Sequence, residues 1–331
     1  MGQPGYGGAS SSCVSFFCGY GTFFKITPSG TLTTLYSFCS QGGCADGEFP
    51  DAGLVQAING DFYGTTVQGG ANPSSYAGGS GTVFKMTPSG ILTTLYSFCS
   101  QSGCADGEFP NPLIQATNGE LYGTTGHGGA YGAGTVFKIT PSGTLTTLYS
   151  FCSQSGCPEF PTAGLVQATD GDFYGTTYGG GVNNSGTIFK ITPSGMLTTL
   201  YSFCSQSGCP DGANPYGGLV QSTNGNFYGT TGYGGAYGNY GTIFSLSVGL
   251  GPFVETRPTS GKVGAVVEIL GTNLTGASSV TFNGTPADFV VSSDSETEIT
   301  ATVPVGASSG KVQVATPSGT LSSNVPYRVL P

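Results

Sequence analysis

The stretch GTVFKITPSGTLTTLYSFCSQSGC, residues 134–157, is the clearest indication of the fold because the chain repeats it with few changes. Its first motif, Gly-Thr-x-Phe, begins five times, at Gly21, Gly81, Gly134, Gly186 and Gly241. A second block, GLVQATDGDFYGTT at 164–177, has counterparts that start at residues 53, 112 and 218. Each period of just over fifty residues therefore contains four short runs rich in Thr, Val, Ile, Phe and Tyr, the residue types that β-strands prefer.

The connections between these runs repeat as well. The first two runs are joined by Asn-Gly or Asp-Gly, as at 118–119 and 170–171, and these pairs tolerate the positive φ angles of a tight hairpin. The last two runs are joined by Thr-Pro-Ser-Gly, as at 140–143, where Pro presets φ for a turn. The other two connections in each period are long and rich in Gly, Tyr and Ser.

Four antiparallel strands in such a period are typical of a β-propeller blade. A β-solenoid is the rival architecture, but its coils are usually shorter and lack two tight hairpins in each unit. We therefore predict an all-β fold: a β-propeller of four or five four-stranded blades, with incomplete terminal blades. In this topology both long loops lie on one side of the disc, so a binding site is expected on that side.

The number of blades stays open at the level of the sequence. The third run occurs five times, whereas the first hairpin and the fourth run each occur four times. The N-terminal hairpin could complete the last blade, or the chain could hold five partial to full blades. Met1 could also open a fragment of a longer protein. An uncovered strand edge would favour pairing with another chain.

The composition limits the possible functions. Only 8% of the 331 residues are charged and 59 are glycines, which argues against a helix-rich protein. An aromatic content of 12% argues against disorder. The net charge of −9 argues against nucleic acid as a partner. No apolar run approaches the ~20 residues of a membrane-spanning helix, so no transmembrane segment is expected.

The repeats end near residue 248, and the remaining sequence has a different pattern. Runs such as VVEIL, SVTFN and EITATVP alternate apolar and polar residues, as in a small β-sandwich. We therefore expect a repeat domain over 1–250 and an immunoglobulin-like domain over 251–331. The second domain resembles the IPT/TIG domain over its full length. The matching residues are Pro258-x-Ser260-Gly261, Gly264, ILGTNL at 269–274, Val280-Thr281-Phe282 with Gly284, and Val303-Pro304 followed by Ser309-Gly310. The resemblance implies a spacer or adhesive module without a catalytic motif.

The repeats have a resemblance of their own. The pattern YGTT-x-x-GG, followed by GT-[VI]-F-K-[IM]-TPSG-x-LTTLYSF, is similar to the GloVer-type tandem repeat of bacterial "choice-of-anchor" extracellular proteins. The resemblance covers residues 1–248 and implies an exported or surface-displayed bacterial protein, with no known activity. Such proteins usually carry a signal peptide and a sorting tail. The sequence contains neither, so we expect a mature or trimmed chain.

The ten cysteines form five pairs, each with four residues between its members: Cys13/Cys18, Cys39/Cys44, Cys99/Cys104, Cys152/Cys157 and Cys204/Cys209. The even number, the regular spacing and the expected loop positions predict local disulfides in an oxidising compartment. Each would close a small ring and pin a loop, at the low end of about 2–4 kcal/mol. Zinc bound by thiolates is the alternative, but His127 is the only histidine and each pair belongs to a different repeat.

Tyrosines of the long loops are the candidate ligand-binding residues. They are Tyr6, Tyr76, Tyr131, Tyr178, Tyr233 and Tyr237. Tyr and Gly together suit stacking on sugars or adaptable contacts with a protein. The aromatic residues of the second strand are instead expected in the core. These are Phe62, Phe173, Phe227, Tyr63, Tyr122, Tyr174 and Tyr228.

Charged residues offer weaker candidates. Asp46, Glu48, Asp106 and Glu108 are weak candidate ligands for Ca²⁺, and Glu159 and Asp211 lie at related positions. We favour a structural role in the turn before the next proline, because no stretch forms a dense calcium loop, and we predict no cofactor. Lys25, Lys85, Lys138 and Lys190 share one strand position, where they are expected to lie over the sheet or to pair with carboxylates. His127 is expected in a solvated loop, without a catalytic partner.

These features predict an extracellular or cell-surface module for adhesion, not an enzyme, with a surface glycan or a protein as its ligand. The alternative is a structural protein that assembles head to tail into a filament or sheath through unpaired strands. A propeller glycosidase or lyase is the third possibility. It is the least favoured because the paired carboxylates recur from repeat to repeat, whereas an active site is normally singular.

Overall fold

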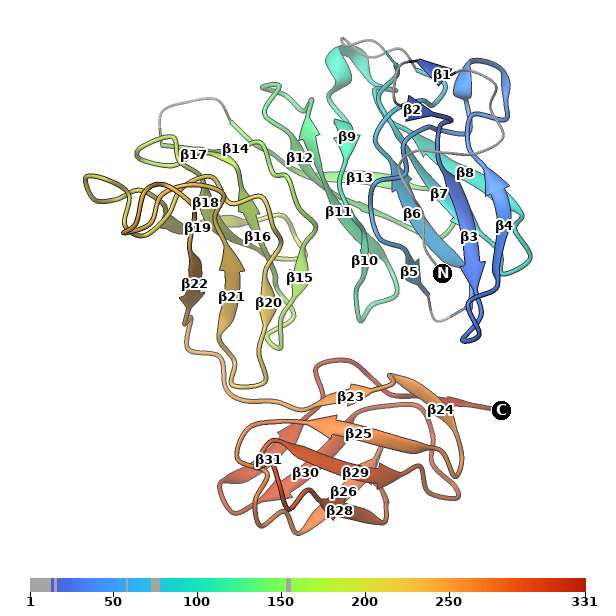
Figure 1. Ribbon diagram of the computed structural model, residues 1–331, viewed down its shortest axis with the longest axis vertical. Helices are drawn as coiled ribbons and strands as arrows, with labels where there is room; N and C mark the ends of the chain where they lie inside the picture. Colours follow the sequence, from blue (N-terminus) through green and yellow to red (C-terminus); the bar gives the residue numbers. More distant parts are fainter. Residues whose placement is uncertain (1–12, 15–16, 58, 73–77, 153–155) are drawn as a thin grey trace. The chain divides into compact units, whose positions relative to one another are not determined.

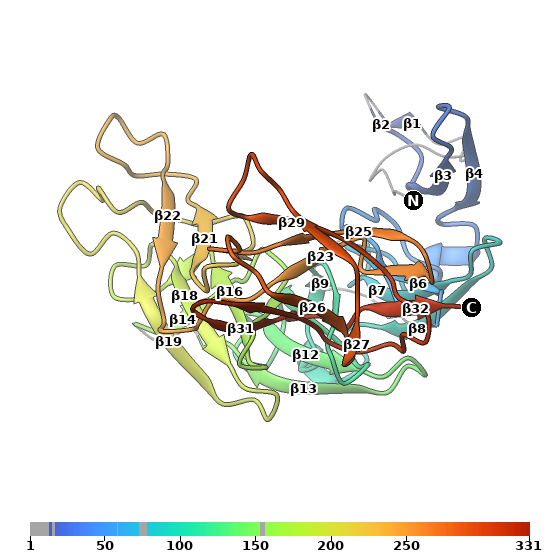
Figure 2. The ribbon, with the colours of Figure 1, turned by 90° about the horizontal axis from the view of Figure 1, so that it is seen from below.

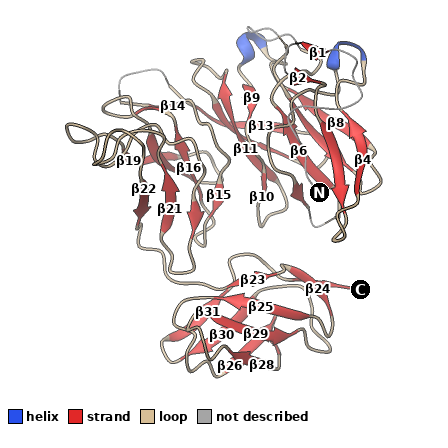
Figure 3. Ribbon diagram, in the orientation of Figure 1, coloured by secondary structure: helices blue, strands red, loops and turns tan. Residues whose placement is uncertain are grey.

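The computed structural model describes the chain except for residues 1–12, 15–16, 58, 73–77 and 153–155, and no side chain before Gly19 is described (Figure 1). Strands and loops make up almost all of the described chain, with two short 3₁₀ turns, η1 (Gly42–Cys44) and η2 (Ser102–Cys104) (Figure 3). None of its helices is long and apolar enough to span a bilayer. The chain forms two compact units. The first comprises residues 1–167, 172–219 and 229–244, and the second comprises 168–171, 220–228 and 245–331.

Three complete repeats form four-stranded antiparallel sheets in which each strand pairs with the next, as the turns predict. Sheet 2 contains β5 (Val55–Gln56), β6 (Phe62–Thr66), β7 (Thr82–Met86) and β8 (Leu92–Ser97). Sheet 3 contains β10 (Ile114–Gln115), β11 (Leu121–His127), β12 (Thr135–Ile139) and β13 (Leu145–Ser150). Sheet 4 contains β15 (Val166–Gln167), β16 (Phe173–Thr177), β18 (Thr187–Ile191) and β19 (Leu197–Ser202). These sheets can be followed in Figure 1 and in the turned view of Figure 2.

The first and last repeats form smaller sheets. Sheet 1 contains only β3 (Thr22–Ile26) and β4 (Leu32–Ser37). Sheet 5 contains β20 (Val220–Gln221), β21 (Phe227–Thr230) and β22 (Ile243–Leu246). In the described chain β3–β4 is a separate hairpin and does not supply a fourth strand to sheet 5. Ahead of it, β1 (Cys13–Val14) pairs with β2 (Phe17–Cys18).

The predicted tight turns lie where the sequence places them. At Asn118-Gly119, the amide of Gly119 donates to the carbonyl of Ala116, and Gly119 has a φ of +85°. At the Thr-Pro-Ser-Gly turn, the amide of Gly143 donates to Thr140 O, and Gly143 has a φ of +98°. Both turns therefore use glycine for a left-handed backbone that other residues adopt at a cost.

The core of the repeats lies between one sheet and the next, because side chains alternate between the two faces of each strand. In sheet 3, Leu121, Phe137 and Ile139 belong to the apolar cluster shared with sheet 2. Tyr122 and Val136, the neighbours of Leu121 and Phe137 in the chain, belong to the cluster shared with sheet 4. Each complete sheet is thus apolar on both faces and needs a neighbour on each side.

The same rule explains which predicted core aromatics are buried. Phe62, Phe173, Phe227, Tyr63, Tyr122 and Tyr174 are all buried, as expected. Tyr228 is 37% exposed, so the expectation is wrong for this residue. Tyr228 belongs to sheet 5, and no further repeat follows to cover the face on which Tyr63 and Tyr122 are packed in sheets 2 and 3.

The C-terminal part is a β-sandwich, as the alternating runs predict. One sheet has the order β23 (Glu255–Arg257), β25 (Val266–Leu270), β29 (Glu298–Thr302) and β28 (Phe289–Val291). The other has the order β27 (Thr285–Pro286), β26 (Ser279–Phe282), β30 (Val312–Thr316) and β31 (Gly319–Ser322). A parallel pair, β24 (Ser260–Lys262) with β32 (Arg328–Leu330), completes it. Inward side chains of both sheets, including Ile269 and Val314, form one buried cluster.

The glycine of the second strand is predicted to be essential for packing within a sheet. A Cβ added at Gly123 would lie 2.7 Å from Cζ of Phe137 and 2.9 Å from Cδ2 of Leu113. We expect Gly123→Ala to lower the free energy of unfolding by about 1–3 kcal/mol through overpacking. Gly126→Ala in the same strand is the control, since its Cβ would meet only ordinary contacts at 3.7 Å. Chemical denaturation measures both, and equal stabilities of the two variants would contradict the packing argument.

Candidate functional site

The two long connections of each repeat are joined by backbone pairing. β9 (Glu108–Pro110) pairs with the end of β11, and β14 (Pro158–Glu159) pairs with β17 (Gly179–Gly180). Isolated bridges Glu48↔Gln68 and Ala213↔Tyr233 make the equivalent link in sheets 2 and 5. In each of these repeats, the segment that precedes the first strand therefore pairs with the segment that follows the second strand. The described parts of the long loops are therefore tied to one another by backbone pairing.

The loop tyrosines that the structure describes reach solvent to different extents. The exposed fraction is 60% for Tyr131, 43% for Tyr233 and 90% for Tyr237. Tyr178 is half-buried. Tyr6 and Tyr76 lie outside the described residues. The expectation that these side chains bind a ligand remains a prediction, and their placement shows which of them could act together.

Two of these tyrosines, Tyr178 and Tyr233, meet around a third aromatic residue, Tyr216, which is 52% exposed. The ring centroids of Tyr178 and Tyr216 are 4.8 Å apart with an interplanar angle of 48°. Hydrogen bonding with Tyr178 is the largest cause that raises the pKa of the Tyr216 phenol to about 12, and desolvation and the neighbouring Tyr233 phenol add to the rise. We call Tyr178, Tyr216 and Tyr233 the tyrosine cluster.

The sequence analysis missed Tyr216 because it precedes the first strand of its repeat, outside the Gly-rich loop that held the other candidates. A signal was available. Tyr216 stands where the other repeats have Asp51, Asn111 and Thr162, each directly after a proline. The position differs in all four repeats and is aromatic in this repeat alone, which is the sequence feature that marks it.

The aspartates considered for Ca²⁺ have structural partners within their own loops. The carboxylate of Asp106 is fully buried and accepts hydrogen bonds from the Tyr96 hydroxyl at 2.8 Å, the Ser100 amide at 2.9 Å and the Gln101 amide at 3.2 Å. Asp46 accepts the same set in sheet 1's loop, from Tyr36, Ser40 and Gln41. These contacts match the structural role that we favoured for both aspartates.

Four of the five predicted disulfides are formed in the described chain. They are Cys39–Cys44, Cys99–Cys104, Cys152–Cys157 and Cys204–Cys209. The side chains of Cys13 and Cys18 lie outside the described part. Zinc bound by thiolates does not apply to these four pairs, because their sulfur atoms are bonded to each other.

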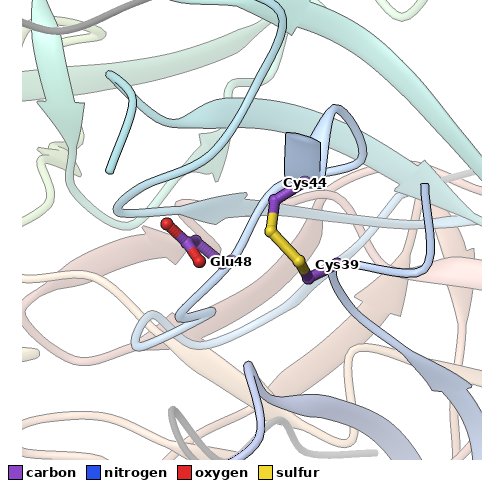
Figure 4. A group of neighbouring side chains, drawn as sticks. All are labelled: Cys39, Cys44 and Glu48. Atoms are coloured by element: carbon purple, nitrogen blue, oxygen red, sulfur yellow. A yellow bond between two sulfur atoms is a disulfide. The ribbon is translucent and has the colours of Figure 1, made fainter. Parts of the chain in front are cut away.

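Glu48 lies beside the Cys39–Cys44 disulfide (Figure 4). Its side chain is buried, and this burial raises the pKa of its carboxyl group. Glu108 has the equivalent place beside Cys99–Cys104, where it accepts a hydrogen bond from the Ser80 hydroxyl at 3.2 Å. Both glutamates face a disulfide and not a set of free ligands, so the weak Ca²⁺ assignment gains no support from their surroundings.

The repeated lysines pair with carboxylates, as expected, in two sheets. Lys138 lies 3.1 Å from Glu120, and Lys190 lies 2.6 Å from Asp172 and above the Tyr174 ring. In each case the acid follows the Asn-Gly or Asp-Gly turn of the same sheet. These ion pairs lie at the strand ends that are joined by tight turns. The long loops are joined to the opposite ends of the strands.

The placement of His127 corrects an expectation. His127 is the last residue of β11 and does not lie in a solvated loop, because β9 pairs with this end of the strand. Its ring is half-buried between Phe109 and Phe160, with centroid distances of 5.6 and 5.2 Å. The sequence could not show this, because the strand is extended by a partner from the preceding loop.

Comparisons with known proteins identify the class of this chain. It is an all-β repeat protein whose C-terminal sandwich is an IPT/TIG domain, since the model of that domain matches residues 254–329. The chain belongs to the family of the Gloeobacter/Verrucomicrobia repeat, whose model matches residues 6–156 and 73–287. A comparison with curated proteins finds no match.

Solved structures show only distant similarity. The periplasmic gluconolactonase of Pseudomonas aeruginosa is 13% identical with a TM-score of 0.43, and the match covers 94% of both chains. A fungal alcohol oxidase of the AA5 family is 16% identical with a TM-score of 0.43, covering 94% of this chain and 70% of the oxidase. A putative gluconolactonase is 12% identical with a TM-score of 0.39, covering 86% of this chain and 81% of that chain. These values say nothing about activity.

The buried Tyr96–Asp106 hydrogen bond yields a prediction about pH. Burial raises the pKa of Tyr96 from 10.0 to about 12. The hydrogen bond with Ser100 opposes this rise, whereas the hydrogen bond with Asp106 adds to it. Because the folded state favours the neutral phenol, this stabilisation is complete below pH 10 and is lost as the pH rises toward 12. We expect Tyr96→Phe to cost about 1 kcal/mol at neutral pH and less at about pH 11.

Urea unfolding at the two pH values measures this difference. Tyr131→Phe is the matched control, because Tyr131 is largely exposed and its hydroxyl should contribute within about 0.5 kcal/mol. A cost for Tyr96→Phe that stays constant with pH would show that the phenol does not titrate as described.

Proposed function

We propose that the chain is an extracellular or cell-surface binding module, used for adhesion, that recognises carbohydrate through the tyrosines of its long loops and carries out no reaction. The observation that carries the proposal is that these loops expose tyrosine side chains to solvent. The phenols of Tyr131, Tyr216, Tyr233 and Tyr237 reach solvent, whereas Asp46 and Asp106 are buried as hydrogen-bond acceptors.

The architecture supports a role as a rigid scaffold. We infer that sheets 1–5 are the blades of a β-propeller, with the first and last blades incomplete, and that the IPT/TIG domain is a spacer. Four disulfides indicate an oxidising compartment outside the cytoplasm. We further propose that the chain is displayed at the bacterial surface.

The chemistry of the loops favours a neutral glycan as the ligand. Phenol rings offer an apolar face for the C–H side of a sugar and a hydroxyl for its polar edge. The net charge of −9 opposes the approach of anionic ligands. Several weak contacts on one chain, or on neighbouring copies at a surface, would add up through avidity.

A screen of immobilised neutral polysaccharides tests this function. We expect the native chain to bind at least one of them without releasing sugar. The variant in which Tyr131, Tyr216, Tyr233 and Tyr237 are all changed to Ala should bind at least about tenfold more weakly, which corresponds to 1.4 kcal/mol. Binding that survives these four changes, or cleavage of the polysaccharide, would contradict the proposal.

A second candidate function, self-assembly, is favoured by apolar side chains on the terminal sheets. Ile26 and Leu32 of sheet 1 are 57% and 56% exposed, and Val220 and Ile243 of the last sheet are 66% and 82% exposed. The residue equivalent to Ile26 in sheet 2, Met86, is fully buried against sheet 1. Both terminal faces therefore have the composition of an internal junction.

Light scattering over a concentration series tests self-assembly. We expect oligomers of the native chain that grow with concentration. Ile26→Glu should shift them toward the monomer, because a charge in an apolar interface is costly. Val305→Glu is the control, since Val305 is 87% exposed in the C-terminal domain. Monomers at every concentration would exclude this candidate.

A further inference from the structure

The tyrosine cluster occurs at one place in an otherwise repetitive molecule. Tyr178 follows the YGTT motif of sheet 4, where the other sheets have Val67, Gly126 and Gly232. Tyr233 stands where the other sheets have Gln68, His127 and Gly179. Packing between sheets explains the residues that recur in every repeat. It does not explain why three tyrosines lie at a single junction.

The residues equivalent to Tyr216 join neighbouring repeats. Asn111 donates through Nδ2 to the Thr124 hydroxyl at 2.9 Å and to the Pro161 carbonyl at 2.8 Å. Thr162 donates through its hydroxyl to the Pro215 carbonyl at 3.3 Å. Tyr216 replaces this small polar link with a large ring that is half exposed. The Tyr216 ring therefore offers an exposed aromatic surface that the smaller residues of the other repeats do not.

The backbone around Tyr216 holds its ring in place. Asn214, with a φ of +53°, donates through Nδ2 to the carbonyl of Tyr178 at 2.9 Å, and its own carbonyl accepts from the Gly232 amide at 3.0 Å. The Tyr216 ring lies over Gly232, where a Cβ would come within 2.8 and 2.9 Å of ring atoms Cδ2 and Cε2. The ring is thus positioned before any ligand arrives, which lowers the entropic cost of binding.

We infer that the tyrosine cluster is a single preformed site for the pyranose rings of a neutral, β-linked oligosaccharide. This inference rests on the proposed function and assigns it to one junction, between sheets 4 and 5, in place of all the long loops. β-Linked glucose and N-acetylglucosamine units carry their ring substituents equatorially, so each ring presents a flat C–H face that can stack on a phenol. The tilted rings of Tyr178 and Tyr216 can contact successive sugar units, while hydroxyl groups of the cluster meet their polar edges.

Titration calorimetry with chitohexaose and with cellohexaose tests the site. We expect at least one of them to bind with one site per chain. Gly232→Ala should weaken this binding at least about tenfold, because the added methyl group displaces the Tyr216 ring. Gly126→Ala is the matched control at the same position of sheet 3, where the added atom has ordinary contacts and no tyrosine lies above it. Its binding should equal that of the native chain.

A second pair of variants covers the case in which Gly232→Ala disturbs folding. Tyr216→Ala should weaken binding to the same extent, whereas Met196→Ala, which removes an exposed side chain beside the Thr-Pro-Ser-Gly turn of sheet 4, should not. The thermal unfolding of each variant is recorded alongside.

Three results would overturn the site. These are no binding of either hexasaccharide at about millimolar concentration, several equivalent sites per chain, and unchanged binding after both Gly232→Ala and Tyr216→Ala. If a polysaccharide binds the native chain and only the fourfold tyrosine variant loses it, the proposed function stands and this site fails. If no polysaccharide binds the native chain, both fail.

Discussion

An edge-to-face pair of phenylalanines at every junction between successive sheets is the contact on which the repeat domain depends. The ring centroids are 5.1 Å apart for Phe38–Phe84 and for Phe98–Phe137, and 5.4 and 5.0 Å apart for Phe151–Phe189 and Phe203–Phe244. In each pair the first ring follows the last strand of one repeat and the second belongs to the third strand of the next. Such pairs add about 0.5–1.5 kcal/mol to the gain from apolar burial.

The same phenylalanine explains the most regular motifs of the sequence. Phe137 lies over Gly123 of the neighbouring strand, and Phe84, Phe189 and Phe244 lie over the equivalent glycines. A side chain at that glycine would displace the ring that joins the sheets. The motifs Tyr-Gly-Thr-Thr and Gly-Thr-x-Phe therefore recur together because each provides one half of a single packing arrangement. Loops outside this arrangement are free to differ, and the tyrosine cluster lies in such loops.

Local patterns of the sequence predicted most of the fold. Strand composition, the Asn-Gly and Thr-Pro-Ser-Gly turns and the cysteine spacing each act over a few residues, so the four-stranded sheets and four disulfides could be predicted without a partner. Features that depend on distant partners were missed. His127 joins a strand only because β9 pairs with it, and Tyr228 is exposed only because sheet 5 is the last of the repeats. The role of Tyr216 depends on Tyr178 and Gly232, which are distant in the sequence.

We propose that function in this repetitive chain resides at the junction between sheets 4 and 5, where three variable loop positions are all occupied by tyrosine. Hydrogen–deuterium exchange with and without the bound hexasaccharide tests this proposal. We predict slower exchange confined to the peptides that contain residues 178–181, 214–217 and 232–235. Equal protection of the equivalent loops in sheets 2 and 3, or protection limited to the C-terminal domain, would contradict the claim.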